Sequence, residues 1–143
     1  FNYLVYMNTI QITELLHKRS LKATKTRIDV LNKIQKHGSA ISHSAIQKVM
    51  KHTDRVTLYR TLEALKEKGV IHKAFQDNNE TYYAICDNNC DAEKHHDEHL
   101  HFKCVKCNSI TCEEMSEAVE ISIPNFVINK VSVNVEGLCL KCV

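Results

Sequence analysis

The sequence predicts an α+β fold in two parts: a winged helix-turn-helix domain, then a small α/β domain with a four-cysteine zinc site. Helical patterns fill the first half of the 143-residue chain and end in a hairpin signal, whereas short strand patterns fill the second half. All seven cysteines lie in the second half, and four of them form two CxxC pairs. We therefore expect one domain at 8–85, a hinge at 86–98 and a second domain at 99–143.

Periodic apolar residues predict the first two helices. The first covers residues 10–19, where Ile10, Leu15 and Leu16 are the apolar positions. The second covers residues 24–36 and is followed by a His-Gly stop signal. Its expected buried stripe is Ile28, Leu31 and Ile34, with Val30 alongside.

Two capping residues mark the next helices. Ser42 precedes the third helix and Asp54 precedes the fourth, which runs to Lys68 and is closed by Gly69. The residues expected to face inward from the third helix are Ile46, Val49 and Met50.

The fourth helix has two different faces. Its predicted buried stripe is Leu58, Leu62 and Leu65. The opposite face suits a recognition helix in a major groove, because arginine can bind guanine or phosphate and apolar groups can contact thymine methyls. Taken alone, Tyr59 is more typical of half-buried packing, and the basic surroundings favour the DNA reading. The predicted DNA contacts are Arg55, Val56, Thr57, Tyr59, Arg60, Lys18, Arg19, Lys22 and Lys25, with Lys51 as a further phosphate contact.

The charge is divided unevenly along the chain. Residues 1–74 hold 14 Lys and Arg against 5 Asp and Glu, whereas residues 75–143 hold 5 against 12. A basic first half favours a polyanion such as double-stranded DNA as its partner, and an acidic half rich in Cys and His favours cations. An ordinary solvated surface is the simpler alternative.

Strand patterns begin after the fourth helix. Residues 70–75 and 81–85 flank an Asn-rich turn and predict the hairpin that forms the wing. Beyond residue 99, strands are expected at Leu100, Phe102 and Ile110 and over 126–135. A short helix is expected over 115–121, before Pro124.

The two CxxC pairs are Cys104 with Cys107 and Cys139 with Cys142, and together they can supply four thiolates to one tetrahedral zinc. The odd number of cysteines favours a reducing cytoplasm and metal ligation over disulfides. No run reaches the roughly 18 apolar residues of a membrane helix, so we expect no membrane partner.

In combination, three stretches resemble the ferric uptake regulator family: VTLYRTLEALKEKGVIHK, HLHFKCVKC and GLCLKC. The resemblance extends from about Leu21 to Cys142 and implies a cytoplasmic, homodimeric, metal-dependent DNA-binding repressor. It also implies that the four CxxC cysteines form a structural zinc site, the same four that the spacing indicates.

The resemblance further suggests which metal is sensed. Iron and peroxide sensors use a first-domain histidine, matched by His43, and a carboxylate in the strand after the wing, which residues 82–85 lack. The layout of His72 and Cys86 is similar to that of zinc uptake regulators, and thiolate with imidazole suits Zn²⁺ better than Fe²⁺ or Mn²⁺. The predicted regulatory zinc ligands are His72, Cys86, His99 and His101, with His96, Cys112, His43 and Glu113 as less favoured candidates.

Three alternatives remain open at this stage. An iron- or peroxide-responsive regulator of the same family is the nearest. A zinc peptidase is a remote one, since His95, Glu98 and His99 fit an HxxEH pattern, although that motif requires a helix. The third is a zinc-ribbon interaction module that does not bind DNA, and the exposed Tyr59 and Arg60 face argues against it.

Overall fold

The computed structural model describes residues 6–77, 79–85, 99–117, 119–129 and 131–143, with His99 described by its backbone alone. These residues fall into two compact units that divide between residues 95 and 96. We call them the N-terminal unit and the C-terminal unit and describe each by itself. The predicted hinge, residues 86–98, lies outside the described residues.

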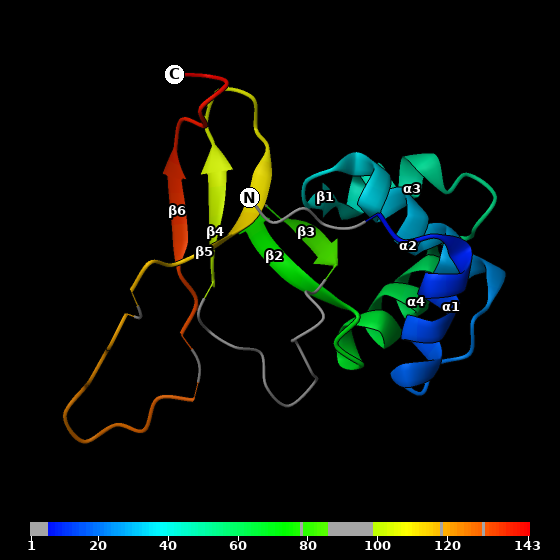
Figure 1. Ribbon diagram of the computed structural model, residues 1–143, viewed down its shortest axis with the longest axis horizontal. Helices are drawn as coiled ribbons and strands as arrows, with labels where there is room; N and C mark the ends of the chain where they lie inside the picture. Colours follow the sequence, from blue (N-terminus) through cyan, green and yellow to red (C-terminus); the bar gives the residue numbers. More distant parts are fainter. Residues whose placement is uncertain (1–5, 78, 86–98, 118, 130) are drawn as a thin grey trace. The chain divides into compact units, whose positions relative to one another are not determined.

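Within its described residues, the N-terminal unit contains four helices and a three-stranded sheet (Figure 1). The sheet has the order β1-β3-β2, and both pairings are antiparallel. This is the winged helix that the sequence predicts, with one short additional strand. In chain order the elements are α1 (Thr9–Lys18), α2 (Lys25–His37), β1 (Ile41–Ser42), α3 (His43–Val49), α4 (Arg55–Glu67), β2 (Ile71–Asp77) and β3 (Glu80–Ile85).

Each of these helices begins at a polar side chain that accepts a hydrogen bond from the backbone of its first turn. The predicted caps Ser42 and Asp54 accept from Ala45 and Thr57, at 3.1 Å and 2.8 Å. Such bonds satisfy amide groups that have no partner within the helix. Helix α2 ends at Gly38, whose φ of 77° lies in the left-handed region that glycine adopts at low cost. The other two caps are Asn8 and Thr24.

The core of this unit lies where the apolar faces of the helices meet the sheet. Leu58, Leu62 and Leu65 of α4 are fully buried, which confirms the predicted stripe. One assignment is wrong: Val49, which was expected to face inward, is 47% exposed. It is the last residue of α3, where one residue of drift in the boundary rotates a side chain out of the apolar face.

The C-terminal unit is built on a second three-stranded sheet, of order β5-β4-β6 (Figure 1). Its strands are β4 (His99–Cys104), β5 (Ile110–Glu114) and β6 (Asn134–Gly137). Strand β4 pairs antiparallel with β5 and parallel with β6. A Cβ at Gly137 would lie 3.3 Å from the Phe102 ring, so β6 approaches β4 closely at the point where the last CxxC turn begins.

The segment between β5 and β6 differs from the prediction. The described residues of 115–133 contain neither the predicted helix over 115–121 nor a strand over 126–133. Most of the large apolar side chains of this segment are exposed, including Val119 at 52% and Phe126 at 73%, whereas Met115, Val131 and Val133 are half-buried. A short helix is marginal without a packing partner, and the exposed side chains have none within the described part of the unit.

No helix within the described ranges is long and apolar enough to cross a membrane.

Candidate metal centre and nucleic-acid surface

Four cysteines converge at one end of the C-terminal sheet. Cys104 is the last residue of β4, and Cys107 lies in the turn that leads to β5. Cys139 and Cys142 lie in the turn that follows β6. Because β4 and β6 are parallel neighbours, the turns that follow them lie at the same end of the sheet. The Val105 N–H donates to the Gly137 carbonyl there, at 2.9 Å.

The four sulfurs are spaced as a tetrahedral zinc requires. All four Sγ atoms lie within 4.8 Å of one another, and the Sγ atoms of Cys107 and Cys139 are 3.9 Å apart. With Zn–S bonds of about 2.3 Å, a tetrahedron places its sulfurs roughly 3.8 Å apart. The four-thiolate set therefore fits a structural zinc, which these residues would hold between the two turns.

Hydrogen bonds shift the pKa values of two thiols of this cluster in opposite directions. Backbone N–H groups of Cys107 and Cys139 lower the pKa of Cys104 to about 6, and Cys139 N lies 3.5 Å from the Cys104 sulfur. The neighbouring Cys139 thiol raises the pKa of Cys142 to about 12. Without a cation the four thiols compete for negative charge, and binding a metal to all four releases their protons.

A second pair of metal-binding side chains lies in the same unit. His101 of β4 is directly opposite Cys112 of β5 in the antiparallel ladder. A ring nitrogen of His101 and the sulfur of Cys112 lie within 4.8 Å of each other, and both side chains are half-buried.

The other predicted regulatory ligands are only partly described. His72 is half-buried on β2, opposite Ala84 of β3. His99 opens β4, and its side chain is outside the described atoms. Cys86 and His96 lie outside the described residues.

His43 begins α3 and packs against the wing. Its ring lies 6.5 Å from the ring of Tyr83 of β3, at an angle of 54°. Its Nε2 atom is buried and has no hydrogen-bond partner among the described residues. An aromatic neighbour on β3, where the iron-type pattern calls for a carboxylate, suits packing better than metal ligation.

The structure reveals one linkage that sequence reasoning missed, between the wing and α3. The Ser44 N–H donates to Glu80 Oε1 at 2.9 Å, and the Ser44 hydroxyl donates to Oε2 at 2.6 Å. These bonds lower the pKa of the Glu80 carboxyl, chiefly through the Ser44 hydroxyl. No local pattern signals the pair, because 36 residues separate its members.

Helix α4 presents the exposed face that was predicted to contact DNA. Val56 and Tyr59 are each 58% exposed, and Arg55 and Arg60 are also exposed. The Thr57 hydroxyl donates to the Asp54 carboxylate at 2.7 Å, so this side chain helps to cap the helix. Apolar, aromatic and cationic groups thus share one solvent-facing surface.

The predicted phosphate contacts lie near the start and end of helices in the same unit. Lys18 ends α1, Lys25 begins α2, and Lys22 lies between them; all three are exposed, as is Lys51. Arg19 is half-buried, which makes it the least accessible residue of this set.

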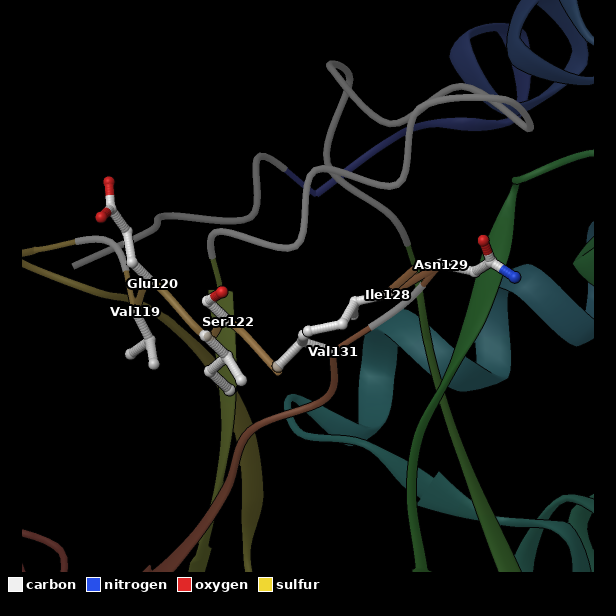
Figure 2. Close-up of a pocket in the computed structure, with 7 residues that line it drawn as sticks. Val119, Glu120, Ser122, Ile128, Asn129 and Val131 are labelled. Atoms are coloured by element: carbon white, nitrogen blue, oxygen red, sulfur yellow. The ribbon is translucent and has the colours of Figure 1, made fainter. Parts of the chain in front are cut away.

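An open hollow of about 630 Å³ lies in the C-terminal unit, away from the cysteine cluster in sequence. Figure 2 shows its lining, which comes from two arms of the segment between β5 and β6. Apart from Glu120 the lining contains no ionisable group, so it does not have the composition of a catalytic pocket. Its residues are Val119, Glu120, Ile121, Ser122, Ile128, Asn129 and Val131.

Comparison with known proteins places these features in a family. The profile of the ferric uptake regulator family matches residues 18–136, which include α4, the wing and the first CxxC pair. The chain belongs to the ferric uptake regulator family. The predicted resemblance is therefore confirmed at the level of the family.

Relatives named for iron and for zinc both match this family member. The ferric uptake regulation protein of Staphylococcus aureus is 29% identical over 142 residues, covering 95% of this chain and 98% of that protein. The structure of holo XcZur superposes with a TM-score of 0.66 at 20% identity, covering 94% and 97% of the two chains. A zinc uptake regulator complexed with zinc and DNA gives 0.60 at 20% identity, covering 93% and 91%.

Membership establishes the general function and removes two alternatives. The chain is a metal-responsive transcriptional regulator of the ferric uptake regulator family, and this family binds DNA operators without being enzymes. The zinc-ribbon module that does not bind DNA is thereby excluded. The peptidase motif is excluded as well, since His99 opens a strand instead of continuing a helix, while His95 and Glu98 lie outside the described residues.

Proposed function

We propose that this regulator is a zinc-responsive repressor of metal uptake genes, acting in the cytoplasm as a homodimer on double-stranded DNA. The observation that carries the choice of zinc is the donor chemistry around His101. The residue directly opposite His101 on β5 is the thiol Cys112. His43, the histidine that an iron-type site would use, lies beside the ring of Tyr83. Sulfur and imidazole donors suit Zn²⁺, and oxygen-rich sites suit Mn²⁺ and Fe²⁺.

The regulatory ligands are drawn from both units of the chain. Cys86 and His101 anchor the proposed site, and His72 and His99 complete it in the set expected from sequence. His96, Cys112 and His43 are the alternatives. Metal binding to a site with ligands before and after residues 86–98 would favour one arrangement of the two units. By linkage, DNA would tighten zinc binding by the same factor as zinc tightens DNA binding.

The exposed face of α4 is the proposed recognition surface. A homodimer would place two copies of α4 in successive major grooves, roughly 34–36 Å apart on one face of the duplex. Val56, Tyr59 and Arg60 would contact bases, and Lys18, Lys22 and Lys25 would contact phosphates. Affinity would then fall steeply with salt, because phosphate contacts release counterions.

The apolar segment between β5 and β6 supports the proposed homodimer. Val127 is 90% exposed, and Phe126 and Ile123 are exposed as well, so this segment presents several apolar side chains, close together in sequence, to solvent. A second copy of the chain is the occupant we propose, since an isologous interface lets the same patch cover itself.

Replacing Cys86 by Ser tests the proposed function. We expect this variant to retain one zinc per chain in the four-cysteine cluster, to lose the second zinc, and to bind operator DNA at least about tenfold more weakly. Zinc is counted by atomic emission after gel filtration, and DNA affinity is measured by fluorescence anisotropy on duplexes selected from a random library.

The control is Cys104→Ser, which removes a structural ligand and should unfold the C-terminal unit instead of leaving it folded and unresponsive. Wild-type operator affinity in the Cys86→Ser variant would show that the site is wrongly assigned. Restoration of DNA binding by Fe²⁺ or Mn²⁺, and not by Zn²⁺, would place the protein in the iron branch.

A further inference from the structure

The base and the tip of the wing are held in different ways. At the base, Ile71 of β2 and Tyr83 and Ile85 of β3 are buried in the core of the N-terminal unit. At the tip, Asp77 and Glu80 form the last pair of the β2–β3 ladder, and both are only half-buried. The tip gains little from apolar burial, so its position depends on hydrogen bonds.

Strand β1 joins the wing to α3, because it pairs with β3 and then runs directly into that helix (Figure 1). At the end of this ladder Ser42 is opposite Tyr82. The same register, extended by two residues, would place Ser44 opposite Glu80, but the chain has by then turned into α3. Side-chain bonds continue the connection there: Glu80 accepts from the Ser44 N–H at 2.9 Å and from the Ser44 hydroxyl at 2.6 Å.

The Glu80 carboxylate also completes the start of α3. The first amide groups of a helix have no partner within it. The Ser42 side chain accepts from the Ala45 N–H, and Glu80 accepts from the Ser44 N–H, so a residue of the wing acts as a second cap. Helix α3 has only seven residues and is marginal without such support. One carboxylate therefore connects the tip of the wing to the helix that precedes α4.

The charge of Glu80 is otherwise unfavourable at this position. Asp77 is directly opposite it in the ladder, and like charges directly opposite each other destabilise a sheet. A carboxylate on a domain that binds DNA also repels phosphate groups. A residue that conflicts with its surroundings in this way is expected where it has a specific task.

We propose that Ser44 and Glu80 are positioning residues for DNA binding, which hold the tip of the wing and the start of α3 in the arrangement that the operator requires. The inference rests on the proposed recognition of operator DNA by the N-terminal unit. Both side chains act through the wing and α3, and neither needs to contact DNA. Without the Ser44–Glu80 pair the tip samples other positions, and affinity falls with the fraction of molecules in the competent arrangement.

Operator affinity of Ser44→Ala, Glu80→Ala and the double variant tests the proposal. Anisotropy titrations use the full-length protein, the metal ion that gives wild type its tightest binding, and a temperature well below every unfolding midpoint. We expect each single variant to bind about three- to tenfold more weakly. The double variant should bind like Glu80→Ala alone, because both substitutions remove the same interaction.

Two matched variants separate positioning from charge. Ser44→Thr keeps the hydroxyl and the amide of this residue and should retain wild-type affinity. Glu67→Ala removes a carboxylate from an exposed position at the end of α4 and should leave affinity unchanged or raise it, since less negative charge favours DNA. The loss expected for Glu80→Ala has the opposite sign.

Hydrogen exchange supplies a readout that does not depend on DNA. In Glu80→Ala the amides of Ser44 and of residues 79–81 should exchange at least about tenfold faster, because the bonds at the tip open locally. The amides of Leu58 and Leu62, which are buried in α4, should keep their wild-type rates. Equal acceleration of all these amides would reduce the effect to global stability and overturn the positioning role.

The affinity measurements can contradict the proposal in three further ways. Wild-type or tighter binding by Glu80→Ala would overturn it, as would additive losses in the double variant. A loss in Ser44→Thr as large as that in Ser44→Ala would also overturn it. Absence of DNA binding by the wild-type protein with every metal ion would instead overturn the proposed function.

Discussion

At the scale of single residues, the structure separates side chains that hold the fold from those available for chemistry. Glu80 shows the difference, since its carboxylate is occupied by two hydrogen bonds from Ser44 and fixes the wing to the start of α3. Cys104 is buried, whereas Cys112 and His101 are half-buried and so more accessible to an incoming ion. Residue type alone does not distinguish these roles.

Glu80→Gln tests the linkage between the wing and α3. The folded-state pKa of Glu80 is lower than its ordinary value of 4.5, so its stabilisation is fully present above about pH 4.5 and is lost as the pH falls through the folded-state pKa. We expect Glu80→Gln to destabilise the N-terminal unit at pH 7 and to differ less from wild type at pH 3, where the contribution of the ionised carboxylate is reduced. Urea unfolding followed by tyrosine fluorescence isolates this unit, because all five tyrosines precede residue 84.

The matched control for that experiment is Glu67→Gln, an exposed glutamate at the end of α4. It should leave the unfolding midpoint within experimental error at both pH values. A destabilisation by Glu80→Gln that persisted unchanged at pH 3 would contradict the assignment of the effect to the ionised carboxylate.

At the scale of elements, α4 combines the two tasks of the N-terminal unit on opposite faces. Leu62 is 1% exposed and belongs to the core, whereas Arg60, two residues earlier, faces solvent. A helix rotates by about 100° per residue, so one segment can pack and recognise at the same time.

Replacing one residue on each face should give opposite results. Leu62→Ala should cost about 2–5 kcal/mol of folding free energy by leaving a cavity. Tyr59→Ala should change stability by less than about 0.5 kcal/mol while weakening operator binding roughly tenfold. Thermal unfolding and anisotropy titration measure the two effects, and unchanged DNA affinity in Tyr59→Ala would remove α4 as the recognition helix.

Short sequence patterns correctly predicted the features that depend on contacts between residues close in sequence. The caps at Ser42 and Asp54 and the leucine stripe of α4 could be read from sequence because each involves residues within a few positions of one another. The pairing of His101 with Cys112 could not, because the register of β4 and β5 depends on the turn between them. The segment 115–131 was misassigned because its apolar pattern has no partner within the described chain to pack against.

At the scale of the whole molecule, the proposed regulator divides its metals between two tasks. The four-cysteine cluster joins the ends of β4 and β6 and stabilises a small sheet whose core is limited. The proposed regulatory site is the one that would respond to metal supply.

The apolar segment between β5 and β6 makes a prediction about assembly. Phe126→Glu should raise the dissociation constant of the proposed homodimer by about tenfold or more, because it would place a charge in an apolar interface. Sedimentation at several concentrations measures that constant. Leu140→Glu, at an apolar residue outside this segment that is 89% exposed, should leave it unchanged; equal effects of both variants would argue against this interface.

The most direct test of the central claim is metal-dependent restoration of DNA binding. The purified protein is treated with a mild chelator until one zinc per chain remains, and its affinity for a selected duplex is then measured after addition of Zn²⁺, Mn²⁺, or Fe²⁺ without oxygen. We predict that one further equivalent of Zn²⁺ restores tight binding and that the other two ions do so at least about tenfold less effectively. Restoration by Fe²⁺ or Mn²⁺ with no response to Zn²⁺ would contradict the claim.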